Sequence, residues 1–238
     1  MKGALCVLVA AALLAAGGAS ARSGSTLTVF AASSLTDAFP KIDPKAAYSF
    51  AGSNTLAAQL RQGAPADVFA SANTALPSAL HRDGLCTKPV VFTRNALVVI
   101  VPRSNPAGVH GVFDLRKRGV KLVIAAPGVP VGDYTLQVLR RLKLRPHVVS
   151  RETDVREVLA KVALGEADAG FVYSTDARTV PHKVRTIRIP ARGQPNVRYG
   201  ICVVSASSHK TAARAFVKRV LGKTGQRILR SYGFLPRR

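Results

Sequence analysis

The fold is decided by the stretch LTVFAASSL, residues 27–35, in which a short apolar run ends in small polar residues. The run Leu27–Ala31 predicts a buried strand, and a helix is expected from about Leu35. The same order recurs at Tyr48–Ala51, where a predicted strand is followed by a predicted helix over 54–62. Strand, small-residue turn and helix in repetition are typical of βαβ units, so the sequence predicts an α/β fold with parallel strands.

The rest of the chain continues this alternation. Further apolar runs predict strands at 67–70, 96–101, 122–125, 169–172, 184–189 and 198–204. Helical patterns occupy 132–142, 155–164, 210–221 and 223–232. Because the middle of the chain repeats the pattern of the beginning, we expect two α/β lobes around a cleft. Clefts between lobes are preferred sites for small ligands.

The first residues have the composition of an export signal. Lys2 precedes an apolar run from Leu5 to Ala16, and the small residues Ala19-Ser20-Ala21 follow. The apolar run is shorter than the roughly 20 residues that cross a bilayer, although an uncleaved anchor is the alternative. We therefore expect residues 1–21 to be a signal peptide that is cleaved after about Ala21, which makes the mature protein periplasmic, cell-surface or extracellular.

The charge of the chain is strongly positive. It holds 35 Lys and Arg against 12 Asp and Glu, a formal net charge of +23, and no acidic residue follows Asp176. In a cytosolic protein this balance would suggest nucleic acid, but the export signal and the lack of interleaved aromatic and basic residues argue against that partner. Three explanations stay open: a solvated basic surface, attraction to anionic membrane or wall polymers, and steering of an anionic ligand.

Two cysteines remain once the signal carrying Cys6 is removed. Cys86 and Cys202 lie in apolar, strand-like surroundings, and neither has a Cys or His neighbour at metal-ligand spacing. A disulfide between them is one possibility in an oxidising compartment, and two free thiols are the other.

Small polar residues stand where predicted strands pass into helices. The first residues of a helix offer unpaired N–H groups and the positive end of a dipole. Four such helix starts facing one cleft would form an anion site without cationic side chains. Tyr173 ends a strand at its carboxyl side, where ligands gather in open α/β sheets. Each residue alone could instead be an ordinary helix cap or a buried ring. The four junctions are Ala32–Leu35, Gly52–Thr55, Val129–Gly132 and Thr153–Val155.

At these positions the chain resembles the periplasmic molybdate-binding protein family. The similar segments follow one another in order through the mature chain and end at Tyr232-Gly233-Phe234. Among the similar segments, the block Gly63-Ala64-Pro65-Ala66-Asp67, with Ser71-Ala72 downstream, is one of the most characteristic of this family. The other segments are Val29–Thr36, Ser53–Ala57 and Gly170–Asp176.

The resemblance implies a type II periplasmic-binding-protein fold, with two lobes and two chain crossings between them. We expect lobe I to comprise residues 25–92 and 203–238, and lobe II residues 93–202. It also implies that the protein delivers its ligand to the membrane permease of an ABC transporter. We expect a monomer, because one cleft needs no second copy. Molybdenum would be held only as an oxyanion, without direct protein ligands to the metal and without a cofactor. The ligand-binding residues carried over are Ser34, Ser53, Val131, Val155 and Tyr173, where Val131 replaces a smaller residue of the family and would contribute only its N–H.

A site built only of hydrogen-bond donors suits a fully deprotonated dianion such as molybdate, tungstate or sulfate. Protonated phosphate brings a hydrogen that needs an acceptor, so such a site rejects it. The predicted function is therefore that of a solute-binding protein for molybdate or tungstate, with another tetrahedral oxyanion such as sulfate as the alternative. A secreted hydrolase is disfavoured, because no Gly-x-Ser-x-Gly motif is present and the five histidines share no motif. A basic protein that adheres to surfaces would explain the positive charge, but it would not explain the small polar residues at the four strand-to-helix junctions.

Overall fold

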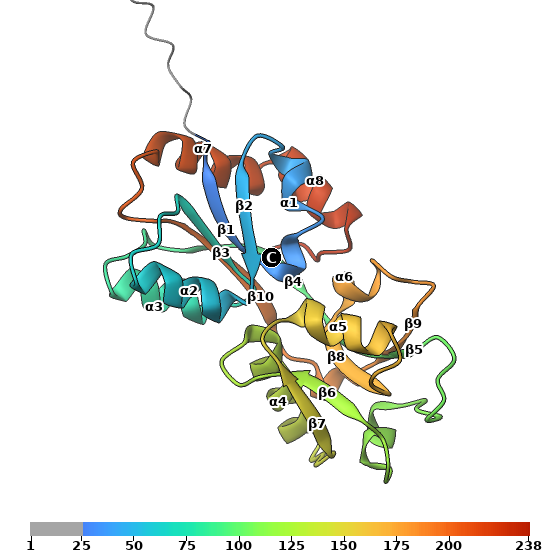
Figure 1. The fold of residues 1–238 in the computed structure, drawn as a ribbon. Coiled ribbons are helices and arrows are strands. Elements are labelled where there is room, and N and C mark those ends of the chain that lie inside the picture. Colours follow the sequence, from blue (N-terminus) through green and yellow to red (C-terminus); the bar gives the residue numbers. More distant parts are fainter. Residues whose placement is uncertain (1–25) are drawn as a thin grey trace, which may run out of the picture.

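The computed structural model describes residues 26–238, so the predicted signal peptide lies outside the described residues. The chain forms two lobes, each built on a five-stranded sheet (Figure 1). The strand order in lobe I is β2 (Ala47–Ala51), β1 (Thr28–Ala32), β3 (Val68–Ser71), β10 (Val197–Val203) and β4 (Val90–Asn95). In lobe II it is β7 (Val148–Glu152), β6 (Leu122–Ala125), β8 (Ala169–Tyr173), β5 (Leu97–Pro102) and β9 (Val184–Arg188).

Helices cover both sheets. Lobe I carries α1 (Phe39–Ile42), α2 (Ser53–Arg61), α3 (Ala75–Arg82), α7 (Lys210–Leu221) and α8 (Lys223–Ser231), with the 3-10 turn η1 (Ser33–Leu35). Lobe II carries α4 (Pro130–Arg141), α5 (Val155–Ala163) and α6 (Ser174–Ala177), with the 3-10 turns η2 (Val112–Arg116) and η3 (Ala191–Gly193). Within residues 26–238 no helix combines the length and the apolar character needed to span a membrane.

The predicted α/β fold is confirmed, but the sheets are mixed rather than parallel. The strands β1, β2 and β3 run parallel, as do β6, β7 and β8. The strand β10 is antiparallel to β3 and β4, and β5 is antiparallel to β8 and β9. The chain passes from β4 in the first sheet to β5 in the second through Ala96 alone.

The two crossings of the chain fall at β4–β5 and β9–β10. Because β4 and β10 lie wholly in the first sheet, the sheets divide the chain between Asn95 and Leu97 and between Arg188 and Val197. The boundaries expected from the sequence, after residues 92 and 202, instead fall inside these two strands. The cavity between the lobes is lined at the carboxyl ends of β1, β2, β3 and β8.

Each lobe has its own packing. In lobe I, Phe39 of α1 packs against Phe92 of β4 and Phe216 of α7, with ring centroids 5.8 and 5.7 Å apart. In lobe II, α5 buries the predicted apolar face, Val155, Val158, Leu159 and Val162. It packs so closely on β8 that a Cβ at Gly170 would lie 2.7 Å from Val158 Cγ1. This contact fixes the start of α5 against the cleft.

Asp67, in the Gly-Ala-Pro-Ala-Asp block, has a structural role. Its carboxylate accepts hydrogen bonds from Thr28 N at 2.7 Å and Ser207 Oγ at 2.6 Å, and His209 Nδ1 lies 3.1 Å away. Burial would raise the pKa of Asp67, but the hydrogen bonds from Ser207, Thr28 and His209 outweigh it and lower that pKa. The carboxylate therefore ties the start of β1 to the segment that leads into α7.

Candidate ligand-binding site

One cavity between the lobes gathers all five residues that the sequence analysis selected. Ser34 and Ser53 come from lobe I, and Val131, Val155 and Tyr173 from lobe II. The cavity measures only about 10 Å³, which is room for about one water molecule. The lobes are thus nearly closed, and entry of an ion with four oxygens requires them to move apart. The remaining lining residues are Ala32, Ser33, Ala51, Gly52, Ala72, Val129, Pro130 and Asp154.

The two lobe I serines are oriented by hydrogen bonds that they make within the protein. Ser53 Oγ accepts a hydrogen bond from Ala72 N at 3.1 Å. Ser34 Oγ lies 2.8 Å from the Tyr199 hydroxyl, which in turn accepts from Asn95 Nδ2 at 3.3 Å. Either hydroxyl can donate in this pair, and Tyr199 can donate to Ser34 while its own oxygen accepts from Asn95. With Tyr199 as the donor, both serine oxygens act as acceptors toward the protein, and their O–H groups are left to donate into the cavity.

Neither serine is a helix cap, which was the alternative explanation for these residues. Ser53 is the first residue of α2, whose N-cap is Gly52, and Ser34 lies inside η1, whose N-cap is Ala32. Neither cap residue makes a side-chain capping bond. The first amides of both turns therefore lie beside the serine hydroxyls at the edge of the cavity.

In lobe II, the N-termini of α4 and α5 present backbone N–H groups. Pro130 at the start of α4 has no N–H, which leaves Val131 as the first residue of that helix that can donate. At α5, the carboxylate of Asp154 accepts from the N–H groups of Arg156 and Glu157. The N–H of Val155 precedes these two and is not used by that cap. Both valines are buried and line the cavity.

Tyr173 supplies a hydroxyl from the end of β8. Its side chain is buried, and its Oη lies near the Tyr199 hydroxyl without a hydrogen bond of good geometry to the residues that the structure describes. Burial, followed by the neighbouring Tyr199, Tyr134 and Asp176, raises the pKa of Tyr173 well above its usual value. The hydroxyl therefore stays protonated and can donate. A buried hydroxyl without a partner is costly, which favours a ligand oxygen as its acceptor.

Formal positive charge is absent from the lining. Among the described residues that line the cavity there is no Lys, Arg or His, and the one acid, Asp154, caps α5. No group of His, Cys, Asp and Glu within residues 26–238 could hold a metal ion. What the arrangement offers is a set of neutral donors around a small cavity, which suits binding of an anion through its oxygens.

Several groups at the site were missed by sequence reasoning. Tyr199 and Asn95 orient Ser34, although they stand 165 and 61 residues from it. Arg156 connects the lobes through Asp37. The Asp-Val-Arg run that contains Arg156 was visible, but only its valine was selected. Nothing in the local pattern around Tyr199 or Asn95 signals a role, because both act through pairing of distant strands.

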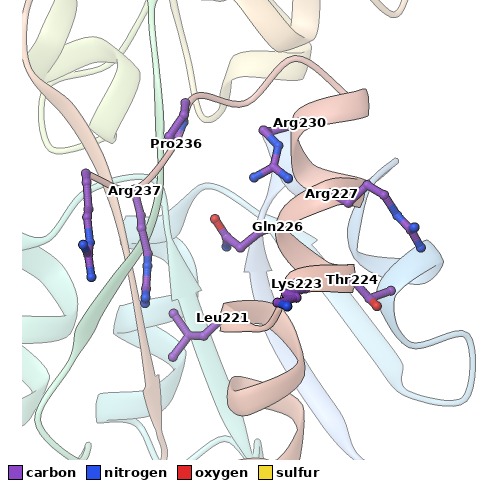
Figure 2. A pocket seen from close by; sticks show the side chains of 9 residues that line it. Leu221, Lys223, Thr224, Gln226, Arg227, Arg230, Pro236 and Arg237 are labelled. Atoms are coloured by element: carbon purple, nitrogen blue, oxygen red, sulfur yellow. The ribbon is translucent and has the colours of Figure 1, made fainter.

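Larger hollows lie elsewhere and gather none of these five residues. One of about 690 Å³ lies beside the crossing strands, lined by Asn95 and Gln194 among others. Another, of about 540 Å³, lies between α8 and the C-terminal tail (Figure 2). Both are open surface grooves rather than enclosed sites. Cys86 and Cys202 lie outside the cavity; both are buried, and both thiols are free in this structure.

The fold and the site define a two-lobed solute-binding protein. In agreement, a sequence model of the bacterial extracellular solute-binding proteins matches residues 27–235. The molybdate-binding protein ModA of Mycobacterium tuberculosis H37Rv is 40% identical over 220 residues, which cover 88% of this chain and 84% of that protein. ModA of Haemophilus influenzae is 35% identical, with 95% and 96% covered. The chain belongs to the ModA family of molybdate-binding proteins.

Solved structures agree on the fold. The periplasmic molybdate-binding protein of Azotobacter vinelandii matches with a TM-score of 0.78 at 22% identity, over 88% of this chain and 98% of that one. The sulfate-binding protein SubI of M. tuberculosis also gives 0.78, at 17% identity, over 89% and 86%. Family membership makes the chain a non-enzymatic component of transport, as the sequence predicted. It also confirms the predicted class of extracellular or periplasmic solute-binding protein.

Proposed function

We propose that the mature protein captures molybdate or tungstate outside the cytoplasmic membrane and delivers it to the permease of an ABC importer. The observation that carries the proposal is the donor set of the cavity. Ser53 accepts a hydrogen bond from Ala72 N, and Ser34 shares one with the Tyr199 hydroxyl. With Tyr199 as the donor of that bond, both serines direct their own hydrogens inward. Tyr173 adds a third O–H. Val131 and Val155 add backbone N–H groups from two helix starts.

This donor set selects by protonation state. A dianion with four oxygens can accept from all five donors, because none of its oxygens carries a hydrogen. Protonated phosphate would direct its own hydrogen toward a donor, and the cavity then loses a bond and gains a repulsive contact. Molybdate and tungstate share charge and shape, so the same cavity accepts both. Sulfate shares the charge but is smaller, so the distance to which the lobes close decides whether it is held.

The proposed function also accounts for the signal peptide, the oligomeric state and the movement of the lobes. The signal is cleaved after about Ala21, and the mature chain acts as a monomer, since a single cavity contains the whole donor set. The two lobes close on the ion, and the closed form is what the permease recognises. No cofactor is required, because the chemistry is binding and release.

Thermal unfolding with molybdate, tungstate, sulfate and phosphate tests the proposal. A ligand that binds only the folded state raises the unfolding midpoint, by an amount that grows with concentration over Kd. Molybdate and tungstate are expected to raise it at micromolar concentration, and phosphate is expected to leave it unchanged. If sulfate raises the midpoint as much as molybdate does, the protein binds tetrahedral oxyanions but the proposed preference for molybdate and tungstate is wrong. If none of the four moves the midpoint, the function itself is wrong.

A further inference from the structure

A strongly basic surface remains that the ligand cavity does not use. Nine Lys and Arg residues in the last 29 residues are all exposed, and no acidic residue lies among them. None of the nine lines the cavity between the lobes. We call this surface the C-terminal basic face. Its members are Lys210, Arg214, Lys218, Arg219, Lys223, Arg227, Arg230, Arg237 and Arg238.

The cations lie in stripes along two helices. Lys210, Arg214 and Lys218 are four residues apart on α7, so they share one side of that helix. On α8, Lys223, Arg227 and Arg230 follow the spacing of a single helix face in the same way. Like charges at this spacing repel one another, so the stripes cost stability unless an anion outside the protein lies against them.

The groove between α8 and the tail brings these charges together. It is lined by Lys223, Arg227 and Arg230 on the α8 side and by Arg237 and Arg238 on the tail side (Figure 2). Its volume is about 540 Å³. Gln226 lies in its floor, where its Nε2 donates to the carbonyls of Phe92 and Val220 at 2.9 and 3.0 Å.

The tail side of the groove is fixed to the sheet. The backbones of Arg94 and Leu235 exchange two hydrogen bonds, of 3.2 and 2.8 Å. Arg94 Nε also donates to the carbonyl of Pro236 at 2.8 Å, and Thr93 Oγ1 donates to that of Leu235 at 2.9 Å. The chain is thus tied to β4 as far as Pro236, which directly precedes Arg237 and Arg238.

Internal carboxylates do not compensate these charges. Within residues 26–238, only Arg219 of the nine forms an ion pair, with Asp43. Eight exposed cations are left for solvent or for an external anion. An anionic surface attracts each nearby Lys or Arg by a similar increment, and the effect is lost beyond a Debye length. A broad stripe of exposed cations fits an extended anionic surface better than a single small ion.

We propose that the C-terminal basic face binds the anionic phospholipid headgroups of a membrane and concentrates the protein at that surface. The proposal rests on the proposed function, because an importer's permease lies in the membrane and a binding protein must reach it. The chemistry recognised is the phosphate of the headgroup. Nucleic acid offers phosphates as well, but the face carries no exposed aromatic ring for base stacking.

Sedimentation with lipid vesicles tests this. The exported protein is mixed at physiological salt with vesicles of phosphatidylcholine, or with vesicles of phosphatidylcholine and the anionic lipid phosphatidylglycerol. It is expected to sediment with the anionic vesicles only, and to be released as salt is raised. The triple variant Lys223→Glu, Arg227→Glu and Arg230→Glu is expected to lower the partition coefficient by at least about 100-fold, because three attractive charges become repulsive.

A matched control changes the same net charge in lobe II. Arg118→Glu, Lys121→Glu and Arg145→Glu also reverse three exposed cations, and this variant is expected to keep most of the vesicle binding. If the two triple variants lose vesicle binding equally, net charge alone attracts the protein, and the C-terminal basic face is not a specific binding surface. Binding to a DNA duplex without binding to vesicles would contradict the proposal that this face binds a membrane. Equal binding to neutral and anionic vesicles would contradict it as well. Molybdate-dependent thermal stabilisation of all three proteins reports separately on the proposed function.

Discussion

The guanidinium of Arg156 in lobe II contacts the carboxylate of Asp37 in lobe I, with Nη2 and Oδ2 2.5 Å apart. On its other side, Arg156 Nε lies 2.9 Å from Oδ1 of Asp176, which is fully buried in lobe II. Arg156 follows Val155 in the chain, and Asp37 lies three residues after Ser34. The ion pair therefore spans the two lobes directly beside the candidate site and couples their closure to the residues proposed to hold the anion.

Asp37→Asn is expected to weaken molybdate binding about two- to fivefold, mainly through faster release. The side chains of Arg156 and Asp37 are 27% and 43% exposed, so the pair is worth roughly 0.5–1 kcal/mol in the closed form. Stopped-flow release measures the effect. Asp83→Asn is the control, because it removes an ion pair with Arg61 of similar exposure within lobe I. An equal change in the two variants would contradict a role in closure.

Gly52 limits how closely the lobes approach. A Cβ at this position would lie 2.5 Å from the carbonyl oxygen of Thr153, which belongs to lobe II. Gly52→Ala is therefore expected to hold the lobes apart and to weaken molybdate binding at least tenfold by calorimetry, while the unliganded protein keeps its unfolding midpoint. At Gly111 the corresponding Cβ meets no atom nearer than 3.9 Å, so Gly111→Ala should bind normally. Unchanged affinity in Gly52→Ala would show that closure does not bring these atoms together.

The serine hydroxyls can be tested individually. Ser34→Ala and Ser53→Ala each remove a hydrogen bond to a charged ligand, worth roughly 1.5–3 kcal/mol, so Kd should rise about 10- to 100-fold in each. Ser33→Ala provides the comparison, because Ser33 also lines the cavity but precedes the residue that Tyr199 orients. If Ser33→Ala weakens binding and Ser34→Ala does not, Ser33 rather than Ser34 is the serine that binds the ligand.

Local patterns predicted most of the fold. The strand at 122–125 and the helix at 210–221 have the predicted bounds, because an apolar run and a helical periodicity end there at clear signals. The helix expected from Leu35 is instead the turn η1 followed by the short α1, since Pro40 begins a new helix rather than continuing the old one.

Six elements were not predicted at all: α3, α6, β4, β7 and the 3-10 turns η2 and η3. The helix α3 contains Pro77, which weakens the helical signal. The edge strand β7 exposes alternate residues, so its sequence resembles a polar loop. Its pairing with β6 is set by the sheet rather than by its own residues.

The candidate site was more predictable than the network that supports it. Helix starts and strand ends are local features, so Ser34, Ser53, Val131 and Val155 could be selected from sequence. The hydrogen bond from Tyr199 to Ser34 and the ion pair from Arg156 to Asp37 join residues more than 100 positions apart. Such pairs depend on how the two lobes pack, and a single sequence carries no local signal for them.

The two cysteines are placed to pair. Cys86 forms a bridge opposite Val204, two residues along from Cys202, and both side chains are buried. A hydrogen bond with the Cys86 thiol, together with burial, raises the pKa of Cys202. We expect the exported, oxidised protein to show no titratable thiol after denaturation without reductant. Reduction is expected to lower stability by roughly 2–4 kcal/mol, and the variant Cys86→Ala with Cys202→Ala should not respond to reductant. Two titratable thiols per chain in the oxidised protein would refute the disulfide.

The buried carboxyl of Asp176 should make stability depend on pH. Burial raises the pKa of Asp176 from 3.8 to about 7, although the Arg156 guanidinium opposes the change. Between these values the unfolded chain has released a proton that the folded protein still binds, so the free energy of unfolding falls as pH rises from about 4 to 7. The fall should amount to a few kcal/mol, because each tenfold difference in proton affinity corresponds to about 1.4 kcal/mol. Carboxylates with lowered pKa values, such as Asp67 and Asp114, lose their contribution only below about pH 4 and do not interfere.

Urea unfolding between about pH 4.5 and 7.5, a range that brackets the titration of Asp176, measures this slope. Asp176→Asn should flatten it, because an amide takes up no proton, and Asp83→Asn should leave it unchanged. An identical slope in Asp176→Asn would mean that Arg156 keeps the carboxyl ionised throughout this range.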